Sequence, residues 1–571
     1  MRRIAPLFAA LALAACATTP SLEPGPAPTP PETVTVRVVG INDFHGNLEP
    51  IRRPFTYVHS DGSTEQVQVG GVAALGALVG NLRGTSSYSM VVSAGDLISA
   101  SPLVSSLFLD EPTVTAMGRL GLEFSAVGNH EFDRGWRELK RMQDGGCQQL
   151  TMRAPCQVEQ FAGASFTILS ANVAFAESGE TLFPAAGLKR LDGPDGEVAI
   201  GVIGLTLKDT PTLVTPGGVE GLVFSDEAQA INRQVQPLLD QGASAIVVAI
   251  HQGLYSDLPP DAPGCEGIRG PLLEILGQID PRVDLVISGH THQTYVCDFA
   301  AIDPARRFLV TSAGYGGTFV TDIVLTIDPA RGDVIASTAR NVLVRSDGAS
   351  AEAIDHDLAA YVARYAEAAR DVAGRPVGRI AGEGRKPGPA TEETSLGNAI
   401  ADAQLFATRD AGARIAFMNN SGIRADLTPA ADGTVSFGDI FAVQPFGNQL
   451  VTRRYTGAQL LALLEQQFDD EGFVQTFSAS HGFALTYDMG RAAGARVVSA
   501  SLDGQPIDPA ASYRVTMNSF LAAGGDSFTV FTLGEDSVVG PVDLDAFELW
   551  LGQEPARTLP PTGRITDATI R

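Results

Sequence analysis

The first half of the sequence repeats one pattern. A short apolar run rich in Val and Ile ends at once in a polar turn that carries Asp, Asn or His. Continuous runs of this kind are typical of strands buried on both faces, as in layered α/β folds. Ligands of such sheets bind beyond the carboxyl ends of the strands, where successive loops meet. We therefore expect one site built from the turns that follow the runs at 34–41, 89–93, 124–127, 245–250 and 284–287.

The pattern becomes helical near residue 354. Apolar residues recur there at three- to four-residue spacing over 354–372, and Gly374 followed by Pro376 ends the helix. We interpret 346–375 as a helical linker between two domains, because the following part alternates strands and helices again. A chain of 571 residues is long enough for two or more domains.

Composition excludes several classes of protein. Hydrophobic residues make up 44% and charged residues 18% of the chain, which is typical of a globular protein and rules out disorder over most of its length. No apolar stretch reaches the roughly 20 residues that a membrane-spanning helix needs. The formal net charge of −25 would repel a nucleic-acid polymer, so we exclude DNA or RNA binding as the main role.

The N-terminal residues resemble the export signal of a bacterial lipoprotein. Two arginines precede a short apolar run, and small residues then lead to Cys16. This predicts a signal peptide over 1–15, lipid attachment to Cys16, and a periplasmic or cell-envelope location. Ala17 after the cysteine favours the outer membrane of a Gram-negative bacterium. A plain secretory signal cut elsewhere is the alternative, and the Pro-rich stretch 16–33 predicts a semi-rigid tether in either case.

Four further cysteines form an even set, as is common in an oxidising compartment. Pairing of Cys147 with Cys156 and of Cys265 with Cys297 is the most local of the possible connectivities. A zinc site made of all four thiolates is the alternative, although no Cys-x-x-Cys spacing supports it.

Seven side chains in the polar turns have the chemistry of metal ligands. Taken singly, each is more simply explained as a turn former, a helix cap or a solvated histidine. Together they include four of the eight histidines of the chain, and the mixture of imidazole, carboxylate and amide favours Zn, Mn, Fe or Co over Ca. Seven ligands suit two divalent ions that share one carboxylate. The candidates are Asp43, His45, Asp96, Asn129, His251, His290 and His292.

The blocks that contain these residues resemble the calcineurin-like metallophosphoesterase signature over about 34–345. Chief among them are Asp43-Phe44-His45-Gly46, Gly128-Asn129-His130-Glu131 and Gly289-His290-Thr291-His292. The whole chain is similar to the bacterial 5′-nucleotidase / UDP-sugar hydrolase family. The resemblance implies a two-domain α/β fold: an N-terminal four-layer α/β/β/α sandwich over 34–345, the linker helix, and a C-terminal α/β nucleotide-binding domain over 376–571.

The resemblance also implies how the ligands divide. Asp96 would bridge two metal ions. The first ion would be held by Asp43, His45 and His292, and the second by Asn129, His251 and His290. Some relatives place Gln where this chain has His292, and a third imidazole at the first ion favours a transition metal.

His130 and Asp133 complete the implied catalytic centre. In the family the matching histidine approaches the phosphate, and the matching aspartate orients the ring and raises its basicity. Their three-residue spacing would place both on one face of a helical turn, although a helix N-terminal cap explains it equally. We interpret Glu131 as a residue that supports the ligands from behind. A metal-activated water would attack phosphorus in line, with no covalent enzyme intermediate.

The C-terminal part carries candidate nucleotide contacts. A lone Phe usually belongs to a core and Gly-Gly-Asp usually marks a turn, so these candidates rest on the resemblance. It implies that Arg424 binds phosphate, that two phenylalanines sandwich the base, and that one aspartate binds the ribose hydroxyls. The candidate substrate-binding residues are Asn419, Arg424, Phe446, Phe520 and Asp526.

One departure from the family pattern concerns the phosphate. Relatives often carry an arginine where this chain reads Ala-Thr-Glu-Glu-Thr over 390–394. Arg385 and Lys386 lie upstream and could compensate; otherwise the grip on phosphate is weaker.

The implied activity is metal-dependent hydrolysis of nucleoside 5′-monophosphates to nucleoside and phosphate, in nucleotide catabolism outside the inner membrane. The same centre would serve a UDP-sugar hydrolase or a phosphodiesterase of 2′,3′-cyclic nucleotides. A lipoprotein that binds nucleotides without turnover is the alternative from another class, and the intact ligand set argues against it. We expect a monomer that meets the membrane only through its N-terminal lipid anchor.

Overall fold

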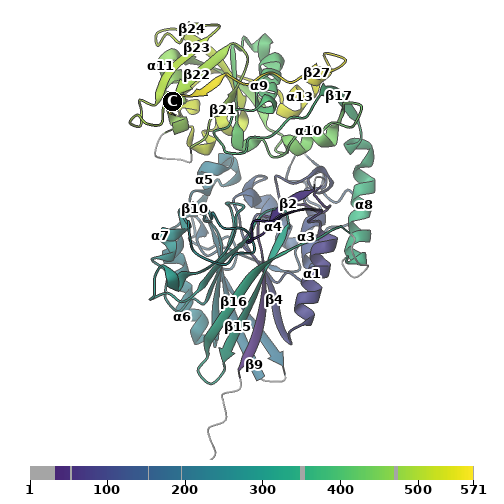
Figure 1. Cartoon of the computed structure of the whole chain (residues 1–571), viewed down its shortest axis with the longest axis vertical. Coiled ribbons are helices and arrows are strands. Elements are labelled where there is room, and N and C mark those ends of the chain that lie inside the picture. Colours follow the sequence, from purple (N-terminus) through teal and green to yellow (C-terminus); the bar gives the residue numbers. More distant parts are fainter. Residues whose placement is uncertain are drawn as a thin grey trace, which may run out of the picture.

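The computed structural model describes residues 33–51, 54–151, 153–193, 196–347, 354–468 and 474–569. The predicted signal peptide, the lipid-bearing Cys16 and the tether up to residue 32 lie outside these residues. Figure 1 shows two lobes, with the N-terminal lobe below the C-terminal one and helix α8 (His356–Ala373) along one side.

Two six-stranded sheets form the centre of the N-terminal lobe. The first sheet has the order β16-β15-β1-β4-β5-β6, with bounds Asp333–Leu343, Phe319–Asp328, Val34–Ile41, Tyr88–Ser93, Phe124–Ala126 and Thr167–Leu169. The second has the order β13-β14-β12-β11-β9-β8, with bounds Thr294–Asp298, Leu309–Ala313, Leu285–Ser288, Ala245–His251, Gly196–Thr206 and Ala186–Gly193. All five strands expected before the polar turns are present within one or two residues of their predicted bounds.

The lobe is four layers thick. Val, Ile and Leu side chains of both sheets, such as Val36, Val38 and Val247, pack between the sheets. Helices on the outer face of the first sheet share a second apolar core with it, and helices on the outer face of the second sheet share a third. These helices are α1 (Val72–Gly84), α3 (Glu111–Leu120), α4 (Trp136–Asp144) and α8 for the first sheet, and α6 (Glu227–Asp240) and α7 (Leu272–Leu276) for the second. The four-layer α/β/β/α prediction is confirmed.

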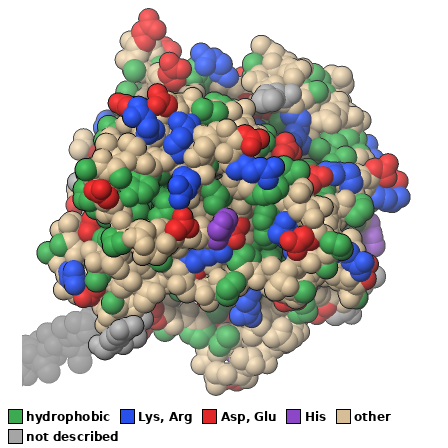
Figure 2. Space-filling model, turned by 90° about the horizontal axis from the view of Figure 1, so that it is seen from above, with side chains coloured by type: hydrophobic (Ala, Val, Ile, Leu, Met, Phe, Trp, Pro, Cys, Tyr) green, Lys and Arg blue, Asp and Glu red, His purple; other side chains and the backbone are tan. Residues whose placement is uncertain are grey.

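The C-terminal lobe is also mixed α/β. Its main sheet has the order β21-β18-β25-β20-β26, with bounds Phe477–Ala479, Ile415–Asn419, Ser512–Asn518, Gln449–Thr456 and Glu535–Val542. Smaller sheets are built from β17 (Pro376–Ala381), β19 (Thr434–Ser436) and β27 (Arg557–Thr558), and from β22 (Phe483–Tyr487), β23 (Val497–Leu502), β24 (Gln505–Pro506) and β28 (Ile565–Asp567). Its helices include α9 (Ser395–Thr408), α10 (Phe437–Val443), α11 (Gly457–Glu465), α12 (Ser519–Ala522) and α13 (Asp543–Leu551). Seen from above in Figure 2, acidic and basic side chains are interspersed on the visible face.

Helix α8 connects the lobes. The side chain of Asp355 accepts hydrogen bonds from the N–H groups of Asp357 and Leu358, which caps the first turn. Its buried face joins the core beneath the first sheet, and the helix also contacts α10 of the C-terminal lobe. The helix ends before Gly374, as expected. The domain limits at 345 and 375 remain predictions.

Two disulfides join Cys147 to Cys156 and Cys265 to Cys297, with Cα–Cα distances of 5.6 and 4.9 Å. These are the local pairings expected, and they replace the alternative of a four-thiolate zinc site. Among the described residues, none of the helices combines the length and apolar character needed to cross a bilayer.

Candidate metal centre

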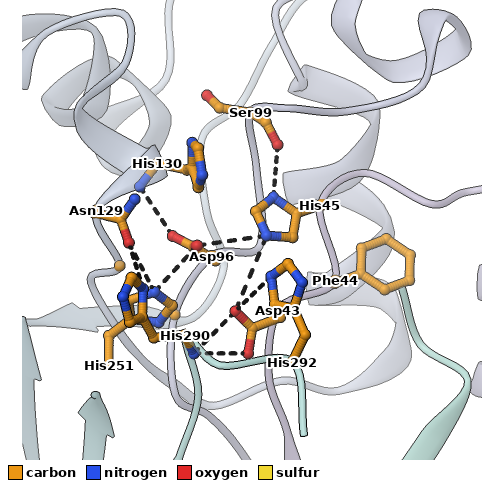
Figure 3. Close-up of polar contacts among 12 residues, drawn as sticks. Asp43, Phe44, His45, Asp96, Ser99, Asn129, His130, His251, His290 and His292 are labelled. Carbon is orange, nitrogen blue, oxygen red and sulfur yellow. Dashed lines mark hydrogen bonds and ion pairs between the residues drawn. The ribbon is translucent and has the colours of Figure 1, made fainter. Parts of the chain in front are cut away.

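The predicted ligands meet at the carboxyl edge of the two sheets. Strand β1 pairs in parallel with β4, β4 with β5, and β11 with β12, so the loops after these strands open in one direction. Figure 3 shows the side chains converging from these loops. Five of the seven have a positive φ, which costs non-glycine residues roughly 1–3 kcal/mol each and is typical of functional sites. They are Asp43, His45, Asp96, His290 and His292.

The first group of ligands surrounds Asp43. Its Oδ1 lies 4.0 Å from Nε2 of His45 and 3.5 Å from Nε2 of His292. Asp43 and His45 are fully buried, and His292 is partly exposed. These three side chains can present one ligand atom each to a single ion.

The second group surrounds Asn129. Its Oδ1 lies 3.1 Å from Nε2 of His251 and 3.1 Å from Nδ1 of His290. Asp96 lies between the groups, because its Oδ2 is 3.4 Å from Nε2 of His45 and 3.1 Å from Nε2 of His251. The structure therefore brings all seven predicted ligands together, with Asp96 in the position of a shared carboxylate.

Burial and mutual charge set the protonation of this cluster. Burial lowers the pKa of His45 to about 3 and that of His290 to about 3, so both rings are neutral. Burial raises the pKa of Asp43 to about 7, helped by the charge of Asp96. Burial alone would lower the pKa of His251, but the charge and hydrogen bond of Asp96 raise it to about 10.

These residues fit divalent cations. Nδ1 of His45 lies 2.9 Å from the carbonyl oxygen of Ser99, so Nδ1 carries the proton and Nε2 carries a lone pair. That Nε2 is buried, has no hydrogen-bond partner in the described part of the chain, and faces the carboxylate oxygens of Asp43 and Asp96. A lone pair aimed at anionic oxygens is unfavourable unless a cation lies between them. The nitrogen and oxygen donors suit Zn, Mn, Fe or Co.

Glu131 supports the centre from behind, as interpreted from the sequence. Its buried carboxylate accepts hydrogen bonds from the N–H groups of Asp96 at 3.0 Å, Leu97 at 2.8 Å and Gly128 at 2.6 Å. It thus joins the loop after β4 to the loop after β5. The two loops are so close that a side chain on Gly128 would overlap the carboxylate of Asp96.

His130 and Asp133 lie beside the ligands. Nδ1 of His130 is 2.8 Å from Oδ2 of Asp133, and the backbone N–H of His130 donates to Oδ1 of Asp96 at 2.9 Å. The turn between them is a short 3₁₀ helix, His130–Phe132, rather than an α-helical turn. The negative charges of Asp133 and Asp96 outweigh burial and raise the pKa of His130.

The C-terminal lobe reaches this dyad. The ring of Phe446 stacks on that of His130, with centroids 5.8 Å apart and an interplanar angle of 16°. The guanidinium of Arg424 lies 6.0 Å from the centroid of Phe446, and its charge lowers the pKa values of the neighbouring His45, His290 and His292 beyond the effect of burial. Arg424 and Phe446 therefore face the metal centre across the boundary between the lobes.

The remaining substrate candidates lie in the C-terminal lobe. Asp526 is partly buried in a 3₁₀ turn with a φ of 54°, and its Oδ2 accepts hydrogen bonds from Asn419 at 3.1 Å, Ser421 at 2.9 Å and Gln475 at 2.9 Å. Phe520 lies on α12, where its ring covers Gly525. Lys386 directs its Nζ toward the carbonyl oxygen of Arg424 at 3.5 Å, so one of the two upstream basic residues does lie beside that arginine.

Comparison with known proteins identifies the family. Residues 36–294 match the calcineurin-like phosphoesterase model, and residues 376–533 match the 5′-nucleotidase C-terminal domain model. A 5′-nucleotidase precursor from Thermus thermophilus superposes with a TM-score of 0.75 at 26% identity, over 93% of this chain and 99% of that one. The chain belongs to the 5′-nucleotidase family. Its calcineurin-like phosphoesterase domain implies divalent metal ions, and the described residues include candidate ligands for them.

Two sequence relatives extend beyond this chain. Endonuclease YhcR of Bacillus subtilis is 29% identical over 90% of this chain but only 39% of its own length. Cell wall protein Lmo0130 of Listeria monocytogenes is 31% identical over 90% of this chain and 66% of its own length. The chain thus spans less than two thirds of each of these relatives.

Several residues that shape the site were not expected from the sequence. Ser421 and Gln475 hold Asp526, and Ser99 holds His45. Ser421 lies two residues after the candidate Asn419, which was a usable signal. Nothing in the local sequence marks Ser99 or Gln475, because each acts through a contact with a residue far along the chain.

Proposed function

We propose that this 5′-nucleotidase family member hydrolyses nucleoside 5′-monophosphates to a nucleoside and phosphate. The stacking of Phe446 on His130 carries the proposal. It places an aromatic ring from the predicted nucleotide-binding lobe directly beside the metal centre. A nucleotide held by the C-terminal lobe would therefore present its phosphate to the ligands of the N-terminal lobe.

We assign the metal ligands as the sequence predicted. Asp43, His45 and His292 hold one ion, and Asn129, His251 and His290 hold the other. Asp96 serves both, since its Oδ2 lies within 3.4 Å of a histidine of each group. When bound, two such ions supply a nucleophilic water and neutralise charge on the phosphoryl oxygens.

His130 would act on the phosphate or on the leaving oxygen. Its Nδ1–H donates to Asp133, so its Nε2 is the nitrogen available to substrate. Asp133 fixes that tautomer, and the raised pKa of His130 lets the ring carry a proton to the departing alkoxide.

The C-terminal residues would select a nucleotide. Phe446 and Phe520 would stack on the base, and Arg424 would pair with the phosphate. Asp526 has three donors on Oδ2, which leaves Oδ1 to accept hydrogen bonds from the ribose hydroxyls. Lys386 would add positive charge beside Arg424.

The test is release of phosphate from AMP by the purified chain, after chelation and reloading with Zn²⁺, Mn²⁺, Co²⁺ or Fe²⁺. UDP-glucose, 2′,3′-cyclic AMP and an aryl phosphate serve as parallel substrates, with His130→Ala as the inactive control. We expect metal-dependent turnover, with AMP preferred. Nucleotide binding without any metal-restored turnover would instead support the non-catalytic alternative, and a higher kcat/KM for UDP-glucose or the cyclic nucleotide would reassign the substrate.

We further propose an envelope location for the chain as a monomer, with the domain limits predicted above and a lipid on Cys16. Two disulfides are expected of a protein that folds in an oxidising compartment. One relative carries the name cell wall protein, which agrees with an extracytoplasmic place. Mass spectrometry of the native N-terminus tests the anchor, because an acylated Cys16 has a defined mass increase that a simple secretory cleavage lacks.

A further inference from the structure

A buried carboxylate lies outside the predicted ligand set but close to it. Asp110 immediately precedes α3 and is fully shielded from solvent. The loop that leads to it begins after Asp96 and contains three further non-glycine residues with a positive φ: Ser99, Ala100 and Leu109. Such residues persist only where surrounding contacts enforce their conformation. The side chain of Asp110 contacts this loop at Ser99 and Ser105.

Asp110 connects three segments. Its Oδ2 accepts a hydrogen bond from the backbone N–H of Ser99 at 3.1 Å, and Oδ1 accepts one from the hydroxyl of Ser105. The guanidinium of Arg134 pairs with Oδ2 and also reaches the hydroxyl of Ser106 at 3.1 Å. The charge of Arg134 outweighs the effect of burial and lowers the pKa of Asp110, so the pair is ionic.

This network ends on a metal ligand. The carbonyl oxygen of Ser99 lies 2.9 Å from Nδ1 of His45, and that contact leaves Nε2 of His45 directed at Asp43 and Asp96. Arg134 also follows Asp133, the partner of His130, in the sequence. A single arginine thus ties the turn of the catalytic dyad to the loop that orients His45.

We propose that Asp110 and Arg134 are a positioning pair that holds His45 ready to bind the first metal ion. This inference rests on the proposed ligand assignment. The pair fixes the backbone of Ser99, Ser99 fixes the His45 ring, and the ring directs Nε2 toward the ion. Partners that orient a metal-bound histidine in this way typically contribute about 10–100-fold to metal affinity.

A second histidine of the same centre, His251, serves as a comparison for His45. His251 is oriented by an equivalent contact, because its Nδ1 lies 2.9 Å from the carbonyl oxygen of Ala94. The backbone N–H of Ala94 donates a hydrogen bond to the carbonyl oxygen of Ile41. Among the described residues, no hydrogen bond joins Ala94 to the Asp110 network. Loss of Asp110 should therefore affect His45 and spare His251.

The test uses the full-length metal-free protein, titrated calorimetrically with Co²⁺ in the absence of substrate. The variants are Asp110→Asn, Arg134→Met and the milder Arg134→Lys. Asp322→Asn is the matched control, since Asp322 is also buried and paired with an arginine, Arg37, but lies on strand β15 away from the ligands. Proton NMR of the Co²⁺-loaded protein then follows the exchangeable imidazole N–H signals of His45 and His251.

We expect Asp110→Asn and Arg134→Met to weaken one of two Co²⁺ binding steps by about 10–100-fold and to leave the other unchanged. The N–H signal of His45 should broaden by solvent exchange while that of His251 persists. Arg134→Lys should fall in between, because lysine keeps the charge but not the forked contact. Asp322→Asn should bind both ions as the wild type does.

Wild-type affinity at both steps in Asp110→Asn would overturn the inference. So would an equal loss at both steps, or a loss that Asp322→Asn reproduces, because each outcome means general destabilisation. Binding and NMR are read without turnover, so failure to hydrolyse AMP would reject the proposed substrate and leave this result standing. A wild-type protein that binds only one ion would instead reject the ligand assignment on which the pair depends.

Discussion

The candidate metal centre and the proposed nucleotide site are built in different ways. Every proposed metal ligand comes from one lobe and lies at or just after the end of a strand, so the sheets and the Glu131 contacts fix its position. The proposed nucleotide site draws on the end of β18, on helix α12 and on loops of the other lobe, and Phe446 joins it to the centre. We therefore expect the chemistry to depend on one shared cluster and substrate choice to depend on separable contacts. Substitutions should have effects of very different size in the two regions.

The largest effect is expected at the shared carboxylate. Asp96→Asn removes the charge that both groups of ligands share, and we expect kcat to fall roughly 10³-fold or more for every substrate. Metal content measured by elemental analysis should fall together with kcat. A variant that keeps both ions and near-wild-type kcat would show that the cluster does not act as a unit.

The next largest effect is expected at the dyad of His130 and Asp133. Asp133→Asn leaves the shape of the His130 contact but weakens control of its tautomer and charge, so we expect kcat to fall about 10²-fold while bound metal stays constant. Steady-state kinetics with AMP and an aryl phosphate measure this fall in kcat. A rise in KM alone would mean that Asp133 has no part in the chemical step.

Substitution of the two phenylalanines should distinguish the role of the nucleotide site from that of the metal centre. Loss of stacking in the double variant Phe446→Ala, Phe520→Ala should lower kcat/KM for AMP by about 10–100-fold. The aryl phosphate offers no nucleobase, so its kcat/KM should change little. Equal losses for both substrates would contradict a stacking role and would indicate instead that Phe446 supports His130.

The smallest effect is expected from Gln475. Gln475→Leu removes one of three donors to Asp526, and we expect about a 3–10-fold loss of kcat/KM for AMP, the size of one hydrogen bond. A nucleotide without ribose hydroxyls is the control and should be unaffected. The same loss for both nucleotides would place the effect on the fold of the lobe instead of on ribose recognition.

The sequence predicts the metal centre well because the end of a strand determines where the next few residues lie. The run at 34–41 forms β1 with those bounds, and the polar turn after it carries Asp43 and His45 into the site. A parallel sheet needs only the order of its strands to bring such turns together. Both disulfides were predicted from the short spacing of their cysteines, whereas the four-layer fold was implied by the family resemblance.

Contacts between distant loops could not be predicted from the sequence. Asp110 looks like an ordinary helix cap, and only the folded loop shows that it holds Ser99 instead. The stacking of Phe446 on His130 depends on how two lobes are placed, which no local pattern encodes. The turn at His130 is 3₁₀ and not α-helical, a difference that the three-residue spacing of His130 and Asp133 does not resolve.

The disulfide between Cys147 and Cys156 bears on when the enzyme matures. The backbone N–H of Cys156 donates to the carboxylate of Glu111, the residue directly after Asp110. Formation of this disulfide thus stabilises the segment around Asp110, through which His45 is oriented. We expect chains made in a reducing cytosol to capture cations poorly and to do so fully only once their thiols are oxidised. Export would then precede loading, and the cation supply outside the cytosol would decide which element the enzyme carries.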